Sequence, residues 1–471
     1  MAAVKLPLPA YLPDQSANSG VLLEANGVIP RVDGFGPIGA FLAISSALPA
    51  TFRGGAACIA TNGTSYLFAG TANGLSRYSA GGWTSLLTAM SVTEQWRFVT
   101  FGNYAVAVNG VETKVVDLSA GTASALAGAP AGKVIAVIGD YVVIGQAAGD
   151  LTAIYTSKAN DHTGWNILDG ATVQPMLAGG EVMGLAGGEY GVILQRQRLV
   201  RMNLTGDGTA PFSYDPITDN VGCASKASVC SYGRTVFFLS DNGFMALEDG
   251  QALRPIGSEK VDRTFMQSLP PEEYERIFSA VDPKTKTVRW VVPGSPGRVW
   301  IYNYELDKWS TDTPVIDGLF AGFTSSQTLE QVSATYPDLD AMPYSLDDPR
   351  FSGGSPQLYA VQDGAIGSFS GSPRKASFQY GFGEFVQGRI ARFRGVRPVT
   401  DCVAGQTVTL DLRDRQGDAA TTRACGPLRA SGIMPVRGSG RYAKPRWEIE
   451  AGATWSYAQG LEFEFEAGGI R

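Results

Sequence analysis

His162 is the only histidine in the chain, so it is the only side chain that could act as the imidazole base of a Ser-His-Asp or Cys-His catalytic arrangement. It lies in the stretch TSKANDHTGWN, whose polar residues separate two apolar runs. Such a stretch predicts a surface loop, in which an exposed turn residue is expected more often than a general base. We therefore expect no catalytic role for His162.

The cysteines offer little further chemistry. Their number is odd, no two form a C-x-x-C pair and none lies near the histidine in sequence; they are Cys58, Cys223, Cys230, Cys402 and Cys425. Cys223 and Cys230 could meet across a turn, whereas buried free thiols are the simpler expectation for a protein assembled in a cytosol. A metal site has no support in this pattern.

Motifs of other enzyme classes are also missing. The sequence contains no G-x-x-x-x-G-K-[ST] phosphate loop and no H-E-x-x-H zinc helix. Asp161, Gly164 and Trp165 follow part of the order of a sialidase Asp-box turn, but the complete spacing is absent and does not recur. A glycosidase needs two carboxylates at a set separation, and no pair stands out among 44 acidic residues. We therefore expect no catalytic, cofactor-binding or metal-binding residues, and we expect that the protein is not an enzyme.

Composition and charge narrow the possible partners. The formal net charge is -6 and the pI is about 5.1, whereas proteins that bind nucleic-acid phosphates tightly usually carry more basic than acidic residues. Double-stranded DNA could still pass close to such a surface without sticking, because like charges repel. No run approaches the ~20 apolar residues that span a bilayer, and the N-terminal stretch MAAVKLPLPAYLPDQSANSG lacks the apolar core of a signal peptide. We expect a soluble protein.

Short apolar runs joined by tight turns dominate the chain after an N-terminal segment, residues 1–50. Asn-Gly and Asp-Gly pairs suit two-residue hairpins, and they occur at Asn62-Gly63, Asn73-Gly74, Asn109-Gly110, Asn242-Gly243, Asp249-Gly250 and Asp363-Gly364. Units of this kind recur about every 40–50 residues, the period of four-stranded propeller blades. The pattern predicts an all-β fold with a β-propeller of six or seven blades over residues 51–374. A pair of β-sandwiches is the alternative.

Two segments interrupt this pattern. Residues 258–280 are expected to be a short helical insertion, with Ser258 as a possible N-cap and Pro270-Pro271 as a break. Residues 330–355 are rich in acidic residues and proline and are expected to form an exposed loop.

Residues 375–471 alternate apolar and polar positions, as in GLEFEFEAGGIR, which predicts a C-terminal β-sandwich with one buried face per strand. The segment is rich in arginine, at Arg389, Arg392, Arg394, Arg397, Arg437, Arg441 and Arg446. Arginine can pair with carboxylates in a bidentate fork, although solvated strand faces are the simpler explanation. The residues that we expect at interfaces with other subunits are Arg389, Arg392, Arg394, Arg397, Asp338, Asp340, Asp347 and Asp348.

Two stretches of the chain resemble a known family. YTSKANDHTGWNILDG opens a region from Tyr155 to Phe265 that continues through GGEVMGLAGGEYGVILQRQRLVRMN to DNVGCASKASVCSYGRTVFFLSDNGFMALEDGQALRPIGSEKVDRTF. The other stretch is the carboxyl end, RYAKPRWEIEAGATWSYAQGLEFEFEAGGIR. Both are similar to the tail hub or nozzle proteins of short-tailed bacteriophages, the packaged-DNA stabilisation family.

The resemblance implies a structural virion protein rather than an enzyme. It implies a homohexameric ring in the phage tail, assembled in the host cytoplasm, that contacts the portal or adaptor ring and other tail proteins. The ring would retain packaged double-stranded DNA without sequence readout and conduct it during ejection. The alternative is a carbohydrate-active or glycan-binding propeller, either a tail-associated hydrolase or an adhesin.

Overall fold

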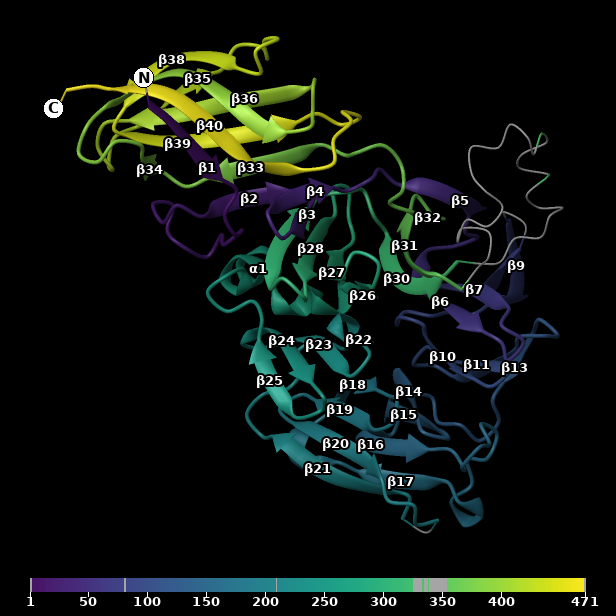
Figure 1. Ribbon diagram of the computed structural model, residues 1–471. Coiled ribbons are helices and arrows are strands. Elements are labelled where there is room, and N and C mark those ends of the chain that lie inside the picture. Colours follow the sequence, from purple (N-terminus) through teal and green to yellow (C-terminus); the bar gives the residue numbers. More distant parts are fainter. Residues whose placement is uncertain are drawn as a thin grey trace.

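The protein consists of a ring of four-stranded sheets and a β-sandwich, and helices are few and short (Figure 1). The computed structural model describes residues 2–79, 82–208, 210–324, 333, 338 and 354–469. The expected all-β fold, a propeller followed by a C-terminal sandwich, is confirmed.

Four blades of the ring are built from consecutive strands of the first half of the chain. Blade 1 contains β6 (Phe52–Ile59), β7 (Ser65–Thr71), β8 (Gly74–Ser79) and β9 (Gly82–Leu87); blade 2 contains β10 (Arg97–Phe101), β11 (Tyr104–Val108), β12 (Thr113–Asp117) and β13 (Thr122–Ala125); blade 3 contains β14 (Val134–Ile138), β15 (Tyr141–Ala147), β16 (Asp150–Thr156) and β17 (Thr172–Pro175); blade 4 contains β18 (Val182–Ala186), β19 (Gly191–Gln195), β20 (Leu199–Leu204) and β21 (Phe212–Thr218).

Three more blades complete the ring, so the described residues form seven blades. Blade 5 contains β22 (Cys230–Tyr232), β23 (Thr235–Ser240), β24 (Gly243–Glu248) and β25 (Ala252–Pro255); blade 6 contains β26 (Phe278–Asp282), β27 (Thr287–Val292), β28 (Arg298–Asn303) and β29 (Lys308–Asp312); blade 7 contains β30 (Gly318–Phe323), β31 (Pro356–Gln362), β32 (Ala365–Ser368) and, from the N-terminal segment, β5 (Leu42–Ala47).

Turn chemistry explains how blade hairpins form. Between β31 and β32, Asp363 and Gly364 both have positive φ angles, 50° and 74°, as a type I′ hairpin turn requires. Glycine adopts this backbone region without steric cost and aspartate tolerates it better than most residues. The Asp-Gly pairs in the sequence therefore fix where these strands reverse.

The ring is closed by apolar cores between successive blades. Each blade shares a cluster of buried residues with the next, and the last cluster joins blade 7 to blade 1, where Phe320 and Tyr359 pack with Leu67. Strand β5 adds a hydrogen bond between blades 7 and 1, in which the indole N–H of Trp83 in blade 1 donates to the Ser46 carbonyl at 3.1 Å. Closure leaves the blades few exposed strand edges.

The helical insertion lies beside blades 5 and 6. It comprises α1 (Asp262–Ser268) and the 3₁₀ turn η4 (Pro271–Arg276); the other 3₁₀ turns are η1 (Ile167–Asp169), η2 (Leu177–Gly179) and η3 (Lys226–Ser228). Ser258 is not the N-cap of α1, as the sequence suggested, because the helix begins four residues later. Instead, the carboxylate of Asp14 accepts the N–H groups of Arg263 and Thr264, both at 2.8 Å.

The sandwich has two sheets. One contains β3 (Val28–Arg31), β4 (Gly34–Pro37), β40 (Ala458–Ala467), β35 (Ala391–Thr400) and β38 (Met434–Gly440), with β1 (Ala2–Pro7) beside β40; the other contains β2 (Leu22–Asn26), β33 (Ala376–Tyr380), β34 (Gly383–Glu384), β39 (Tyr442–Ile449), β36 (Gln406–Arg413) and β37 (Thr421–Ala424). The expected alternation holds along β40, where Leu461, Phe463 and Phe465 are buried between the sheets and the intervening glutamates are partly exposed.

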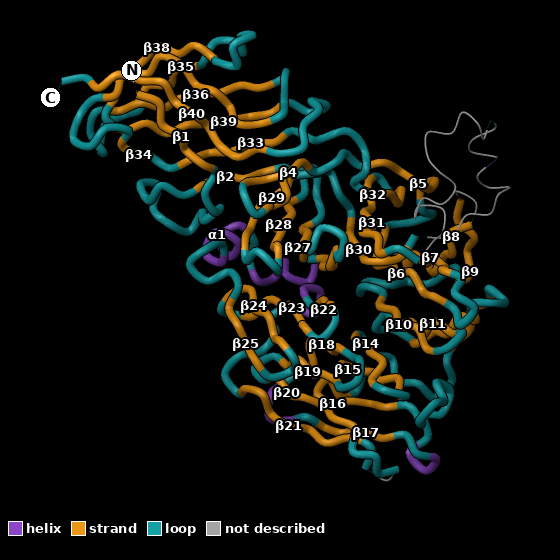
Figure 2. Tube along the Cα trace, viewed as in Figure 1, coloured by secondary structure: helices purple, strands orange, loops and turns teal. Residues whose placement is uncertain are grey.

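The first 50 residues belong to both parts, since β1 to β4 lie in the sandwich and β5 lies in blade 7. The propeller is thus inserted between β4 and β33 of the sandwich. Two chain segments, here called the crossings, connect the sandwich with the propeller. They run side by side, because Gly39 and Pro373 form a β-bridge and the Arg374 N–H donates to the Ile38 carbonyl at 2.8 Å. Figure 2 shows β2, β4 and β29 meeting where the parts join.

Candidate functional site

The single histidine packs against aromatic rings. His162 lies 4.3 Å from the ring centre of Tyr104, and burial lowers its pKa. The neighbouring carboxylate of Asp161 does not orient the imidazole, because it accepts hydrogen bonds from the Thr163 hydroxyl at 2.6 Å and the Thr163 N–H at 2.9 Å. This geometry makes His162 a packing residue at a blade edge.

The thiols are buried or half-buried in this fold. All five cysteines are free, so Cys223 and Cys230 do not form the disulfide that their spacing allowed. Burial raises the pKa of Cys58 to about 11 and those of Cys223, Cys230 and Cys425 to about 12, and it also raises the pKa of Cys402. A protonated thiol is a poor nucleophile and a poor metal ligand. Among the residues that the structure describes, no group of His, Cys, Asp and Glu could hold a metal ion.

A charged network lies at the face of the ring where the inner strands begin. The Lys226 ammonium contacts the Glu94 carboxylate at 3.1 Å and the Glu275 carboxylate at 2.7 Å, and Glu94 also pairs with Lys133 at 2.9 Å. Burial acts to raise the pKa of Glu94, but the pairs with Lys133 and Lys226 lower it. Glu94 and Lys226 border a hollow of about 640 Å³ together with the aromatic rings of Phe52 and Phe278. The charges of this network neutralise one another and tie blades together.

The arginines expected at an interface lie on or beside one strand of the sandwich. Arg392, Arg394 and Arg397 point outward from β35, alternating with buried residues, and Arg389 is exposed in the preceding turn. Arg394 pairs with Glu466 of β40 at 3.0 Å, and its hydrogen bond lowers the pKa of that carboxyl. Arg397 pairs with Glu462 at 3.4 Å. Such exposed pairs contribute little to stability, typically ~0–1 kcal/mol.

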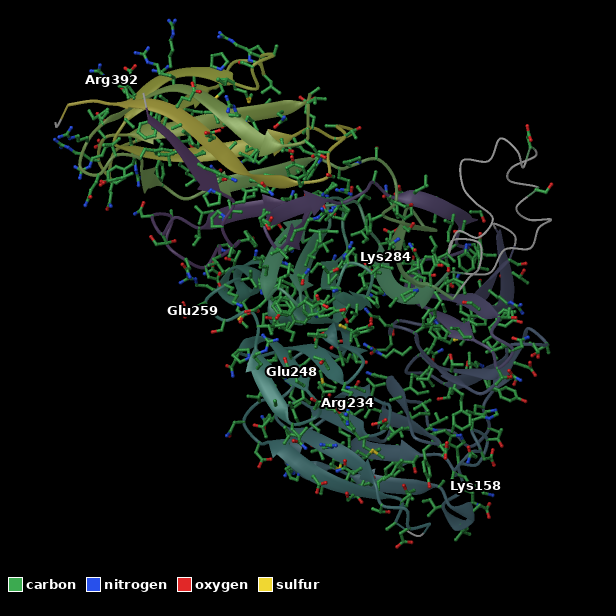
Figure 3. The ribbon with its side chains drawn as sticks, in the orientation of Figure 1. Lys158, Arg234, Glu248, Glu259, Lys284 and Arg392 are labelled. Atoms are coloured by element: carbon green, nitrogen blue, oxygen red, sulfur yellow. The ribbon has the colours of Figure 1, made fainter. Side chains whose placement is uncertain are left out.

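The fold adds further arginines that the sequence did not single out. Arg413 of β36 and Arg423 of β37 join Arg392, Arg394 and Arg437 of β38 around a hollow of about 550 Å³. Arg413 and Arg423 were missed because their strands belong to the opposite sheet, and spacing along the chain does not reveal which strand edges meet. Figure 3 labels Arg392 on the sandwich, far from Lys158 of the propeller.

The acidic residues expected at an interface fall in the segment near 330–355. The structure describes Asp338 of this set, whereas Asp340, Asp347 and Asp348 lie outside the described residues. Their expected contacts therefore stay predictions.

Charge is divided unevenly between the two parts of the chain. Residues 375–471 carry 14 lysines and arginines against 10 acidic residues, a formal charge of +4, while residues 1–374 carry -10. Residues 1–37, whose strands also belong to the sandwich, carry 2 lysines and arginines against 3 acidic residues, so the sandwich as a whole is a positive end, at +3, on a negative molecule. No helix in the described ranges is long and apolar enough to cross a membrane.

No protein-family model and no curated protein matches the sequence. Among solved structures, the chain is similar to the extracellular domain assigned to a hybrid two-component system of B. thetaiotaomicron, at 11% identity over 88% of this chain and 47% of that chain, with a TM-score of 0.41. It is also similar to the RRP9 WD40 repeats, at 10% identity over 60% and 89% of the two chains and a TM-score of 0.38. For PorZ of Porphyromonas gingivalis the identity is 10%, the coverage 82% and 45%, and the TM-score 0.37. The chain spans about half the length of the first and last of these.

Proposed function

We propose that this protein is a structural subunit of a virion, the tail hub or nozzle of a short-tailed bacteriophage. Copies would form a ring, about six in number, that retains packaged DNA and conducts it during ejection. The resemblance of residues 155–265 and of the carboxyl end supports this assignment. The observation on which it chiefly depends is a two-part body with a shared core and opposite charge on its parts.

The propeller and the sandwich share one continuous buried core. Trp290 and Trp309 of blade 6 belong to the same buried cluster as Phe378 and Trp447 of the sandwich. The two crossings between the parts are also hydrogen-bonded to each other. A subunit that must keep its shape under the pressure of packaged DNA benefits from such a joint, because packed interiors resist deformation.

Charge division supports association between copies. A positive sandwich on one copy and a negative propeller on the next attract each other, and a head-to-tail contact of this kind closes into a ring when its rotation permits. The overall negative charge also suits a channel for DNA, since a surface without a basic surplus does not hold phosphates tightly. The portal or adaptor ring would be the neighbour in the tail.

Mass photometry of the purified protein, alone and with the adaptor ring, tests the assignment. We expect a species of about six times the monomer mass of 49.8 kDa, weakened by salt because charge drives the contact. A chain that stays monomeric at low salt in the presence of the adaptor ring would overturn the proposal.

A ligand-binding propeller is the second candidate, either a glycan-binding adhesin or a carbohydrate-active protein. It is favoured by the hollow of about 640 Å³ at one face of the ring, a volume within the range of small-molecule sites. A glycan array and a reducing-sugar assay separate the two candidates, because the hub proposal expects neither binding nor cleavage.

A further inference from the structure

Two strand edges meet on the sandwich and leave a groove between them. β38 lies at one end of its sheet, and β37 lies at one end of the other. The hollow of about 550 Å³ beside them has Phe393 and Leu412 among its lining residues. Gly438 keeps it open, because a Cβ there would lie 2.5 Å from the Cδ1 of Leu412 and 3.3 Å from the side chain of Arg423.

The groove is strongly cationic. Five arginines line it, and three of them, Arg392, Arg423 and Arg437, are exposed and form no ion pair or hydrogen bond through their guanidinium groups with any described residue. Arg392 lies opposite Glu466 of β40, and its charge helps to lower the pKa of that carboxyl. Arg394 is already paired with a glutamate. Arg413 is held in place, since its guanidinium lies 3.7 Å from the ring centre of Phe382 and donates to the Asn18 side chain.

Carboxylates are present at one end only. Asp414 and Asp418 line the groove there, and the Asp418 carboxylate accepts the Arg415 N–H at 3.0 Å, closing its own turn. Arg394 and Arg413 are engaged elsewhere, and the remaining Arg392, Arg423 and Arg437 outnumber these two carboxylates, so the groove retains a positive charge that suits an anionic ligand.

The sandwich itself shows what kind of anion pairs with an arginine-bearing strand. β40 runs antiparallel to β35 with Glu462, Glu464 and Glu466 at alternate positions, and two of these carboxylates pair with Arg397 and Arg394. Alternate residues of a strand face the same side about 7 Å apart. An extended segment with the same alternation would offer carboxylates to the free arginines, while exposed edge strands accept a further strand through their backbone groups.

We propose that this groove binds an extended acidic segment of a partner protein. The carboxylates of the segment pair with Arg392, Arg423 and Arg437, and its backbone lies along the edges of β37 and β38. The site does not require ring formation, since every residue that builds it belongs to one chain. It therefore stands or falls separately from the hub assignment.

Fluorescence anisotropy with a labelled ten-residue peptide of alternating glutamate and threonine tests the site. We expect saturable binding at low salt, and loss of binding by a matched peptide of glutamine and threonine. The double variant R423Q/R437Q is expected to bind at least about tenfold more weakly, because it removes two charge-assisted contacts. Arg429→Gln is the matched control, since Arg429 is an exposed arginine outside the groove. The affinity of this variant for the glutamate peptide is expected to stay within about twofold of the wild-type value.

Each contrary outcome has a defined meaning. The proposal fails if the wild-type protein does not bind the glutamate peptide, or if R429Q weakens binding as much as R423Q/R437Q does. It also fails if a 20-base-pair DNA duplex binds more tightly than the peptide with the same dependence on Arg423 and Arg437, because the groove would then be a phosphate site. Mass photometry of the wild-type protein is read separately, so a wild-type chain that is monomeric but binds the glutamate peptide contradicts only the ring.

Discussion

Asp262, the first residue of α1, is expected to make the fold less stable as pH rises. Its carboxylate accepts the Phe244 N–H at 3.0 Å and is enclosed by Gly243 and Gly257, at each of which a Cβ would overlap a carboxylate oxygen. Burial raises the pKa of Asp262 to about 6, and the nearby negative charge of Asp14 adds to this effect, whereas the hydrogen bond from Phe244 opposes it.

The direction of this pH dependence follows from the linkage between proton binding and folding. The pKa is higher in the folded chain than the ordinary 3.8, so the folded state binds the proton more tightly and is favoured while the carboxyl is protonated. Stability is then lost as pH rises from about 4 to about 6 and stays lost above that range. The difference between about 6 and 3.8 corresponds to about 3 kcal/mol at most, since each pH unit is worth about 1.4 kcal/mol.

Asp262→Asn removes this proton equilibrium while keeping the size of the side chain and an acceptor for Phe244. We expect the free energy of unfolding of the variant, relative to wild type, to rise by up to about 3 kcal/mol between pH 4 and pH 7. Urea denaturation at half-unit pH intervals measures it, and comparing the two proteins cancels the titration of all other groups.

Asp150→Asn is the control of opposite sign. Hydrogen bonds from the Thr152 hydroxyl and N–H lower the pKa of this exposed carboxyl, so wild type should hold its advantage at neutral pH and lose it as pH falls. Parallel pH profiles for wild type and D262N would refute the reasoning, because they would mean that the carboxyl at the start of α1 is already solvated.

Two further predictions concern thiols and blade closure. All five thiols are expected to react with DTNB at pH 8 at least about tenfold more slowly in the folded chain than in urea, because burial keeps them protonated, and rapid labelling of the native protein would contradict this. Gly367→Ala would place a methyl against the Leu42 carbonyl and push β5 away from β32, so we expect about 1–3 kcal/mol of destabilisation and faster amide exchange in residues 42–47. Gly417→Ala, which meets open space, should change neither, and equal exchange in the two variants would show that the seventh blade closes differently.

Local patterns predicted much of this fold. Asp-Gly pairs placed hairpins correctly, as at Asp363 and Gly364, and alternation along 458–467 identified a half-buried strand. The blade number could not be predicted, because the seventh blade borrows β5 from a segment about 320 residues away along the chain. A pairing over that distance leaves no mark on the local sequence.

The arginine groove shows the same limit at the level of a site. Arg392 and Arg394 were identified from their strand, but Arg413 and Arg423 reach them only through the packing of two sheets. The first N–H groups of α1 show the same limit, since the carboxylate that accepts them, that of Asp14, comes from a distant part of the chain. Sequence periodicity reports which face a side chain occupies, whereas tertiary packing decides which faces meet.

The adjacent crossings at Gly39 and Pro373 make the propeller an insertion whose two ends lie side by side. Because the chain leaves and re-enters the sandwich through neighbouring positions, a short loop could bridge them without moving either strand. Exchange of the propeller would nevertheless disturb the sandwich, because Trp290 and Trp309 share a buried cluster with Phe378 and Trp447 and β2 pairs with β29, so the residues at this junction are constrained to change together.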